Sequence, residues 1–260
     1  MVKILLAIDA GNTNIKLGLF EGEELKFTFR LATVRTTTDD EYVLEFFAIL
    51  GAHSIKTSDI TGCIISSVVP EVTQPLKSAV KKILGLNAIV LGAGIKTGVN
   101  IKIDDTSTIG ADFIAQCAAA QEYSAPCIII SLGTATTMLV LDENKTMIGG
   151  AIAPGISISL NALTSTSALL PSVAFELPKK TIGTNTADCL RSGVVLGNAC
   201  MLDGMIEKFE SALGKRCTLV ATGGMASSII GNCKRDIILR EDLVLEGLRK
   251  IFAKNQKSSS

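Results

Sequence analysis

An aspartate followed by a small polar turn is the first part of this 260-residue chain that could do chemistry. Asp9 ends an apolar run that starts at residue 4, the turn at 11–14 is Gly-Asn-Thr-Asn, and a second apolar run covers 15–20. Alternating apolar and β-branched residues predict a strand, a turn and a strand. Such a turn can offer N–H groups to a phosphate, and the carboxylate beside it can hold Mg²⁺. An ordinary hairpin with an Asx-type turn is the alternative that this stretch leaves open.

A second stretch, residues 127–141 with the sequence CIIISLGTATTMLVL, has the same layout. Superposing Gly133 on Gly11 puts Ser131 in the place of Asp9, so a hydroxyl replaces the carboxylate. The same superposition places Thr134 on Asn12 and Thr136 on Asn14. Two phosphate-type hairpins in one chain predict a duplicated domain with a nucleotide held between its halves.

Composition excludes several classes of function. Hydrophobic residues make up 47% of the chain and charged residues 19%, which is enough for a large core in one large or two modest domains. Basic and acidic residues number 25 each, and aromatic residues are only 4%, so we expect neither a nucleic-acid partner nor a membrane partner. The apolar run at the start meets Asp9 too early for a signal peptide, and we expect a cytosolic protein.

Cysteine and histidine usage points away from metal and triad chemistry. The seven cysteines form no CxxC pair and are odd in number, which predicts free thiols in a reducing compartment. His53 is the single histidine and lies in a stretch typical of a helix end or loop. A Ser-His-Asp or Cys-His mechanism would have to use it, and nothing around it favours that chemistry.

The order of predicted elements is that of an α/β protein. In the first half we expect strands over 4–9, 15–20, 25–31, 63–69 and 88–91, and helices over 41–50, 72–84 and from 108–112 through 120. In the second half we expect a hairpin over 127–141, strands over 147–152 and 218–221, and helices over 157–163, 187–213 and 242–252.

Three further features admit both a structural and a functional interpretation. Asp112 falls in the first turn of a predicted helix, where a carboxylate either caps the helix dipole or faces a cleft as a general base. Ser66 and Ser67 end a predicted strand, where they either line a cleft or cap the next helix. Small residues at 193, 197 and 199 suit either a dimer contact or an ordinary core helix.

The chain has no GxxxxGK[ST] motif and no strand-linked GxGxxG motif, but a set of short motifs occurs in a telling order. They are Asp-Ala-Gly-Asn-Thr-Asn at 9–14, Gly-Ala-Asp at 110–112, Gly-Thr-Ala-Thr-Thr at 133–137, Gly-Gly-Ala-Ile-Ala-Pro-Gly at 149–155 and Thr-Gly-Gly at 222–224. Smaller matches occur at 66–70, 182–186 and 245–248. In this order and over nearly the whole chain, they resemble type III pantothenate kinase.

The resemblance implies a fold, a reaction and a set of partners. The fold is two duplicated ribonuclease-H-like domains of the actin/hexokinase/Hsp70 superfamily, with mixed sheets flanked by helices, over residues 1–115 and 116–260. The reaction is ATP-dependent phosphorylation of pantothenate to 4'-phosphopantothenate, the first step of coenzyme A biosynthesis. The implied cofactors are ATP, Mg²⁺ and K⁺ or NH₄⁺. The implied assembly is a homodimer, with a heteromer containing a paralogous subunit as the alternative.

Site residues are carried over from the resemblance position by position. Asp112 would be the base that takes the hydroxyl proton, and Asp9 would lie near Mg²⁺. Pantothenate would touch the Gly110-Ala111-Asp112 motif, the following Phe113, and Thr186. ATP would touch both phosphate loops and the later glycine turn: Asp9, Ala10, Gly11, Asn12, Thr13, Asn14, Ile15, Lys16, Gly133, Thr134, Gly223 and Gly224. Ser131 holds the monovalent-cation position.

The sequence departs from the family pattern at three places. Phe113 stands where the family has an arginine, which removes a fork-shaped donor suited to a carboxylate. Ser131 stands where the family has an aspartate, and Ile103 where it usually has a tyrosine. Three hypotheses remain: a pantothenate kinase with an altered pocket, a nucleotide-binding subunit with little activity of its own, and a kinase of another small alcohol.

Overall fold

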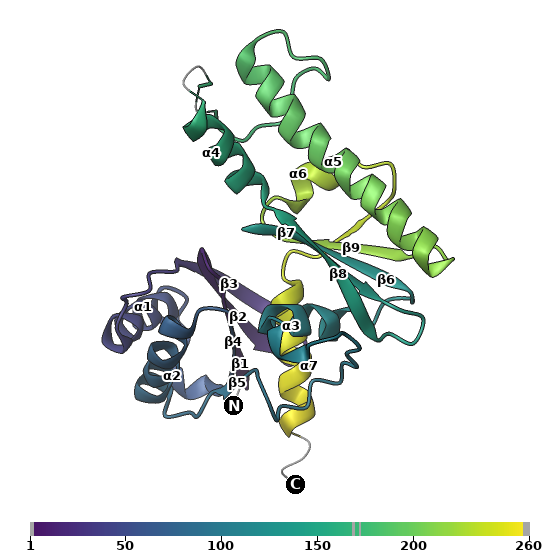
Figure 1. The fold of residues 1–260 in the computed structure, drawn as a ribbon. Helices are drawn as coiled ribbons and strands as arrows, with labels where there is room; N and C mark the ends of the chain where they lie inside the picture. Colours follow the sequence, from purple (N-terminus) through teal and green to yellow (C-terminus); the bar gives the residue numbers. More distant parts are fainter. Residues whose placement is uncertain (1–2, 168–169, 172, 257–260) are drawn as a thin grey trace. The chain divides into compact units, whose positions relative to one another are not determined.

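The chain forms two α/β units, and each is built on a five-stranded sheet (Figure 1). The computed structural model describes residues 3–167, 170–171 and 173–256. Within this range, the first unit gathers residues up to 99, residues 105–119 and residues from 243 onward. The second unit consists of residues 100–104 and 120–242. The α/β class predicted from the sequence is confirmed.

The first sheet has the strand order β3-β2-β1-β4-β5. The first three strands form an antiparallel meander, and the last two run parallel to β1. Their bounds are β1 Ile4–Ala10, β2 Asn14–Glu21, β3 Glu24–Ala32, β4 Ile60–Ser67 and β5 Ile89–Val90.

The second sheet repeats this topology. Its order from the meander end is β8-β7-β6-β9-β10, with β6, β7 and β8 antiparallel and β9 and β10 parallel to β6. The bounds are β6 Cys127–Leu132, β7 Ala135–Leu141, β8 Met147–Pro154, β9 Thr218–Thr222 and β10 Ile238–Leu239. The same strand order in both sheets confirms the duplication predicted from the two hairpins.

One strand runs further than its sequence predicts. The strand expected over 147–152 continues as β8 through Pro154, which pairs with Ala135. β8 is an edge strand of its sheet, where a proline is tolerated because one side of the strand forms no continuous ladder.

Helices cover both faces of the first sheet (Figure 1). α1 (Asp39–Ala52) and α2 (Pro70–Leu84) share one apolar core with it, and α3 (Ala111–Ala120) and α7 (Leu243–Gln256) share the other. Thr38 begins α1 with a capping box that includes Glu41. Two short 3-10 helices lie at Thr57–Asp59 and Thr106–Thr108.

The last helix belongs to the first unit. The division at residue 115 would have placed α7 in the second unit, whereas its apolar face is buried with the first sheet. Leu245 and Leu248 share a core with Leu5 and Ala7 of β1, some 240 residues earlier. The helix packs where its apolar face is buried. Hydropathy along the sequence shows that the face is apolar but not which sheet it packs against.

Three helices pack on the second sheet (Figure 1). They are α4 (Ile156–Thr166), α5 (Thr186–Leu213) and α6 (Ala226–Ile230). Asn185 caps α5 by accepting the backbone N–H of Asp188 at 2.9 Å. No helix in the described parts of the chain is long and apolar enough to cross a membrane.

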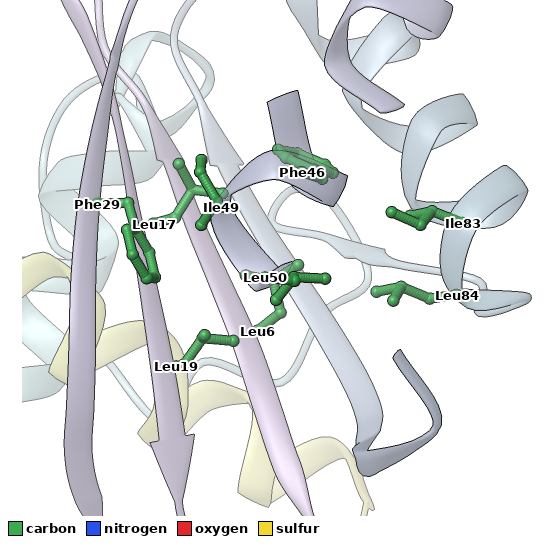
Figure 2. Close-up of a pocket in the computed structure, with 9 residues that line it drawn as sticks. All are labelled: Leu6, Leu17, Leu19, Phe29, Phe46, Ile49, Leu50, Ile83 and Leu84. Carbon is green, nitrogen blue, oxygen red and sulfur yellow. The ribbon is translucent and has the colours of Figure 1, made fainter. Parts of the chain in front are cut away.

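An apolar crevice lies between the first sheet and helices α1 and α2 (Figure 2). Its lining residues are all apolar: Leu6, Leu17, Leu19, Phe29, Phe46, Ile49, Leu50, Ile83 and Leu84. It offers no acid, base or hydrogen-bonding side chain, so we assign it to the core rather than to the functional site.

A close helix contact in the first unit can be tested with Gly247. A Cβ atom added there would lie 1.8 Å from the carbonyl oxygen of Ala115, so α7 can approach α3 only at a glycine. We expect Gly247→Ala to lower the free energy of unfolding by about 2–3 kcal/mol, measured by urea denaturation. Gly51→Ala is the matched control, because a Cβ there meets nothing within 4 Å in helix α1. The control should instead gain about 0.5–1 kcal/mol, and equal effects of the two variants would contradict the contact.

Candidate active site

The candidate site in the first unit is built around Asp9, near the end of β1. Asp9 points to the same face of the sheet as Leu5 and Ala7, the face that α3 and α7 cover. In the strand register, Asp9 is paired with Lys16 of β2 and with Ser66 of β4. The sheet therefore presents a carboxylate between an ammonium group and a hydroxyl on one face.

The electrostatics of Asp9 show that a second carboxylate lies near it. The pKa of Asp9 is raised to about 7: burial is the main cause, and the charge of Asp112 on α3 is the second. The Ser66 hydroxyl and the Lys16 ammonium act in the opposite direction. Two carboxylates held together in a desolvated place are typical of sites that bind a cation or accept a proton.

Asp112 is poised differently from Asp9. Burial raises the pKa of Asp112, and the backbone N–H groups of Phe113 and of Asp112 itself lower it. These N–H groups belong to the first turn of α3, so the helix start orients the carboxylate. The predicted position of Asp112 in the first turn of a helix is confirmed, and its side chain faces Asp9 as well as its own helix.

Gly110 makes room for this carboxylate. A Cβ atom added at Gly110 would lie 2.4 Å from Oδ1 of Asp112. The Asp112 carboxylate thus folds back over Gly110. It occupies the space that the side chain of any other residue at position 110 would fill. The Gly-Ala-Asp order is therefore a packing requirement of the acid's position.

The two serines at the end of β4 differ in what they do. Ser67 Oγ accepts the Val69 N–H at 3.2 Å and the Thr73 hydroxyl at 2.8 Å, so it ties the residue before α2 to the first turn of that helix. Ser66 is fully buried, and within the described chain its Oγ lacks a partner in hydrogen-bond geometry. It lies near enough to Asp9 to favour the charged carboxylate. Of the two roles left open by the sequence, Ser67 has the structural one and Ser66 lines the site.

The turn between β1 and β2 is fixed from outside the hairpin. The Gly11 N–H donates to the Asn14 carbonyl at 3.0 Å, and the side chains at 12–14 are exposed. Thr33, just after β3, donates its hydroxyl to the Gly11 carbonyl at 2.6 Å and its N–H to the Thr13 carbonyl at 3.0 Å. Sequence analysis missed Thr33, because a threonine after a strand carries no signal of a partner 22 residues earlier.

The second unit places hydroxyls where the first places charges. Ser131 of β6 is paired with Thr137 of β7 and Thr222 of β9. The Thr137 hydroxyl is buried and unpaired within the described chain. This row repeats the Asp9 row of the first sheet without an acid or a base.

The register corrects the superposition of the two hairpins. Residues 11–13 connect β1 to β2, whereas only Gly133 and Thr134 connect β6 to β7. The second turn is one residue shorter, so Ala135, and not Thr136, occupies the place of Asn14. The equivalence of Ser131 and Asp9 before the turn is unaffected, and Thr137 becomes the counterpart of Lys16.

Glycines bring three segments of the second unit together at the end of β6. A Cβ at Gly155, the residue before α4, would lie 2.1 Å from the Thr134 carbonyl oxygen. A Cβ at Gly223, whose φ is +101°, would lie 2.5 Å from the Leu132 carbonyl oxygen. At Gly224 nothing lies within 4 Å of the added atom, which leaves backbone open to a flat group.

The remaining predicted site residues lie at the surface or at its edge. Thr186 is exposed and begins α5, behind the Asn185 cap. Ile103 is half-buried in the segment that follows the Ile101 bridge to Met147 of β8. Phe113 is half-buried in the first turn of α3 and donates its N–H to the Gly110 carbonyl at 3.1 Å.

Comparison with known proteins identifies the family. The family model for type III pantothenate kinase matches residues 5–208. The chain belongs to the type III pantothenate kinase family. It is 41% identical over 258 residues to a type III pantothenate kinase from Moorella thermoacetica, covering 97% of this chain and all of that protein. It is 38% identical over 253 residues to one from Halalkalibacterium halodurans, with coverage of 97% and 100%. The family predicted from the ordered motifs is confirmed.

Solved structures agree with this fold. A Baf family transcriptional activator from Campylobacter jejuni superposes with a TM-score of 0.61 at 21% identity, covering 97% of this chain and 99% of that one. The activator of 2-hydroxyisocaproyl-CoA dehydratase from Clostridium difficile gives a TM-score of 0.54 at 14% identity, with coverage of 99% and 98%. At these identities the similarity concerns the fold of a type III pantothenate kinase family member and not its reaction.

The cost of ionising the buried Asp9 carboxylate beside Asp112 can be tested in metal-free protein. Because folding raises the pKa of Asp9 from 3.8 to about 7, the folded state binds more protons between these values, and stability falls as pH rises through this range. We expect Asp9→Asn to raise the free energy of unfolding by about 1–3 kcal/mol at pH 8, and by less at pH 5. Urea denaturation in EDTA measures both, with exposed Asp236→Asn as the unchanged control. A loss of stability on Asp9→Asn at pH 8 would show that the carboxylate is not strained.

Proposed function

We propose that this chain transfers the γ-phosphoryl group of ATP to pantothenate and forms 4'-phosphopantothenate, the first step of coenzyme A biosynthesis. The observation that carries the proposal is the proximity of Asp9 and Asp112 in a chain that belongs to the type III pantothenate kinase family. Phosphoryl transfer asks mainly for positioning and for neutralisation of charge, and this arrangement suits both.

In this proposal Asp112 is the general base. Its carboxylate accepts the proton of the attacking hydroxyl, which is the primary alcohol of the acceptor. The raised pKa of Asp112 supports proton acceptance, because a base is most effective when its pKa approaches the working pH. Gly110 and the first turn of α3 hold the carboxylate in one orientation before the acceptor arrives.

In this proposal Asp9 holds Mg²⁺. A carboxylate with a buried, unpaired hydroxyl beside it is an oxygen donor set of the kind that Mg²⁺ prefers, and a cation there relieves the repulsion between Asp9 and Asp112. When bound, the metal neutralises charge that develops on the transferring phosphoryl group.

We assign the nucleotide to the two turns and the late glycine segment. The turn at 11–14 and Lys16 of the first unit would bind phosphate oxygens. Gly133 and Thr134 of the second unit would do the same, and Gly223 and Gly224 would lie against adenosine. The assignment in the second unit is supported by Gly155 and Gly223. At both positions main chain packs against main chain, so no side chain there blocks the approach of the nucleotide.

Pantothenate would touch the segment at 110–113 and Thr186, in a homodimer. Exposed glycines at 193, 197 and 204 on α5, where an added Cβ meets nothing within 4 Å, support close approach of another helix there. A heteromer with a paralogous subunit would use the same face.

Phe113 favours a second candidate, a kinase of another small alcohol. A half-buried phenyl ring cannot form the paired hydrogen bonds with which a guanidinium group holds a carboxylate. An acceptor alcohol that lacks a carboxylate would fit such a pocket better than pantothenate does.

The reaction is tested with a coupled assay of ADP formation in the presence of pantothenate, Mg²⁺ and K⁺. We expect pantothenate-dependent turnover in the wild type and a loss of at least about 100-fold in kcat for Asp112→Asn, with little change in KM for ATP. Asp236→Asn, an exposed carboxylate, is the matched control and should keep full activity. ATP binding by calorimetry without pantothenate-dependent turnover would reject pantothenate as the acceptor and favour the second candidate or a partner subunit.

The monovalent cation is tested at Ser131. We propose that K⁺ or NH₄⁺ binds beside the hydroxyl row of Ser131, Thr137 and Thr222, and that it binds weakly because the row carries no negative charge. Ser131→Asp should lower the K⁺ concentration for half-maximal activity by about tenfold, or about 1.4 kcal/mol. Ser131→Asn adds an oxygen without charge and serves as the control. Equal effects of the two variants, or no response to K⁺ in either, would count against a cation at this position.

A further inference from the structure

Two carbonyl groups of the turn at 11–14, and the carbonyl group of Ala10 just before it, accept hydrogen bonds from outside the β1–β2 hairpin. The Ala10 carbonyl accepts the Val68 N–H at 3.1 Å, on the β4 side. On the β3 side, the Gly11 carbonyl accepts the Thr33 hydroxyl at 2.6 Å, and the Thr13 carbonyl accepts the Thr33 N–H at 3.0 Å. The last carbonyl oxygen of β1 and two carbonyl oxygens of the turn are thereby held by the residues that follow β4 and β3.

The direction of each carbonyl fixes the direction of the next N–H. In a trans peptide unit the C=O and N–H bonds point to opposite sides of the chain. When Thr33 holds the Gly11 and Thr13 carbonyls, the N–H groups of Asn12 and Asn14 point away from Thr33. A turn that binds an anion needs its N–H groups outward and its carbonyl oxygens, which repel the anion, inward.

We infer that Thr33 is a positioning residue for nucleotide phosphate binding: its hydroxyl holds the Gly11 peptide in the orientation that the anion requires. This inference rests on the proposed function, because it takes the turn at 11–14 as a phosphate loop. Thr33 lies on the scaffold side of the turn and acts through Gly11, without touching the substrate.

Of the two bonds from Thr33, only the hydroxyl bond depends on its side chain. The N–H bond to Thr13 comes from the backbone and remains in any variant except proline. Gly11 is the residue most free to change its backbone angles, so its peptide is the one that needs a side-chain anchor. Removing the hydroxyl therefore loosens one peptide of the turn and leaves β3 in place.

The test compares Thr33→Val, which keeps the shape of the side chain, with Thr33→Ser, which keeps the hydroxyl. We expect Thr33→Val to raise KM and Kd for ATP about 5- to 10-fold, the worth of one hydrogen bond. KM for pantothenate should change less than about twofold, and Thr33→Ser should restore ATP affinity to within about twofold of the wild type.

Val80→Ala is the control for general loss of stability. Val80 is fully buried in the α2 core of the same unit and makes no contribution to the turn. This variant should lower the melting temperature at least as much as Thr33→Val does, with KM for ATP unchanged.

Two results would overturn the inference: unchanged ATP affinity in Thr33→Val, or an equal rise in KM for ATP and for pantothenate. Calorimetry of ATP binding separates this inference from the proposed function. If the wild type binds ATP but does not phosphorylate pantothenate, the proposed acceptor fails. A weaker ATP affinity of Thr33→Val, restored in Thr33→Ser, would then still support the role of Thr33.

Discussion

The burial of the Asp9 carboxylate beside Asp112 is the constraint on which the site depends. Burial alone makes each carboxylate costly to ionise, and their proximity adds to the cost for Asp9. Several groups of the fold lower this cost. They are Lys16 and Ser66 on the neighbouring strands, the backbone N–H groups of the first turn of α3, and Gly110, whose missing side chain makes room for the Asp112 carboxylate. This cost in stability falls where the proposed function needs a cation and a proton acceptor.

Duplication supplied two copies of one sheet, and their chemistry has diverged. Both sheets have the same strand order, and in both a row of three paired residues follows the same geometry. The first row carries an acid and a base, whereas the second carries three hydroxyls, Ser131, Thr137 and Thr222. In the second copy, Gly155 and Gly223 allow main chain to pack closely against main chain, which suits ligand contact through main-chain groups. The two copies therefore differ in the side chains of this row and not in their strand order.

Local patterns predicted the hairpins, the helix start at Asp112 and, through the ordered motifs, the family. What they missed depends on contacts between distant residues. The packing of α7 follows from burial against β1, the shorter second turn from strand register, and the hold of Thr33 on Gly11 from a bond across 22 residues. The strand β10 was missed because its short apolar segment lies between charged residues, Asp236 and Arg240. The proximity of Asp9 and Asp112 was not predicted from local patterns, and the family resemblance gave only a separate role for each residue.

The place of α7 also bears on the order in which the two units can be completed during synthesis. Domains generally fold as they leave the ribosome, with the N-terminal one first. Here the first unit buries Leu5 and Ala7 with Leu245 and Leu248, so the part of this sheet face that α7 covers stays exposed until α7 emerges, although α3 on the same face is made earlier. The second unit ends at residue 242 and is fully synthesised before that helix. The unit whose synthesis begins first is therefore completed last, and the surface that α7 covers stays exposed while the second unit is synthesised.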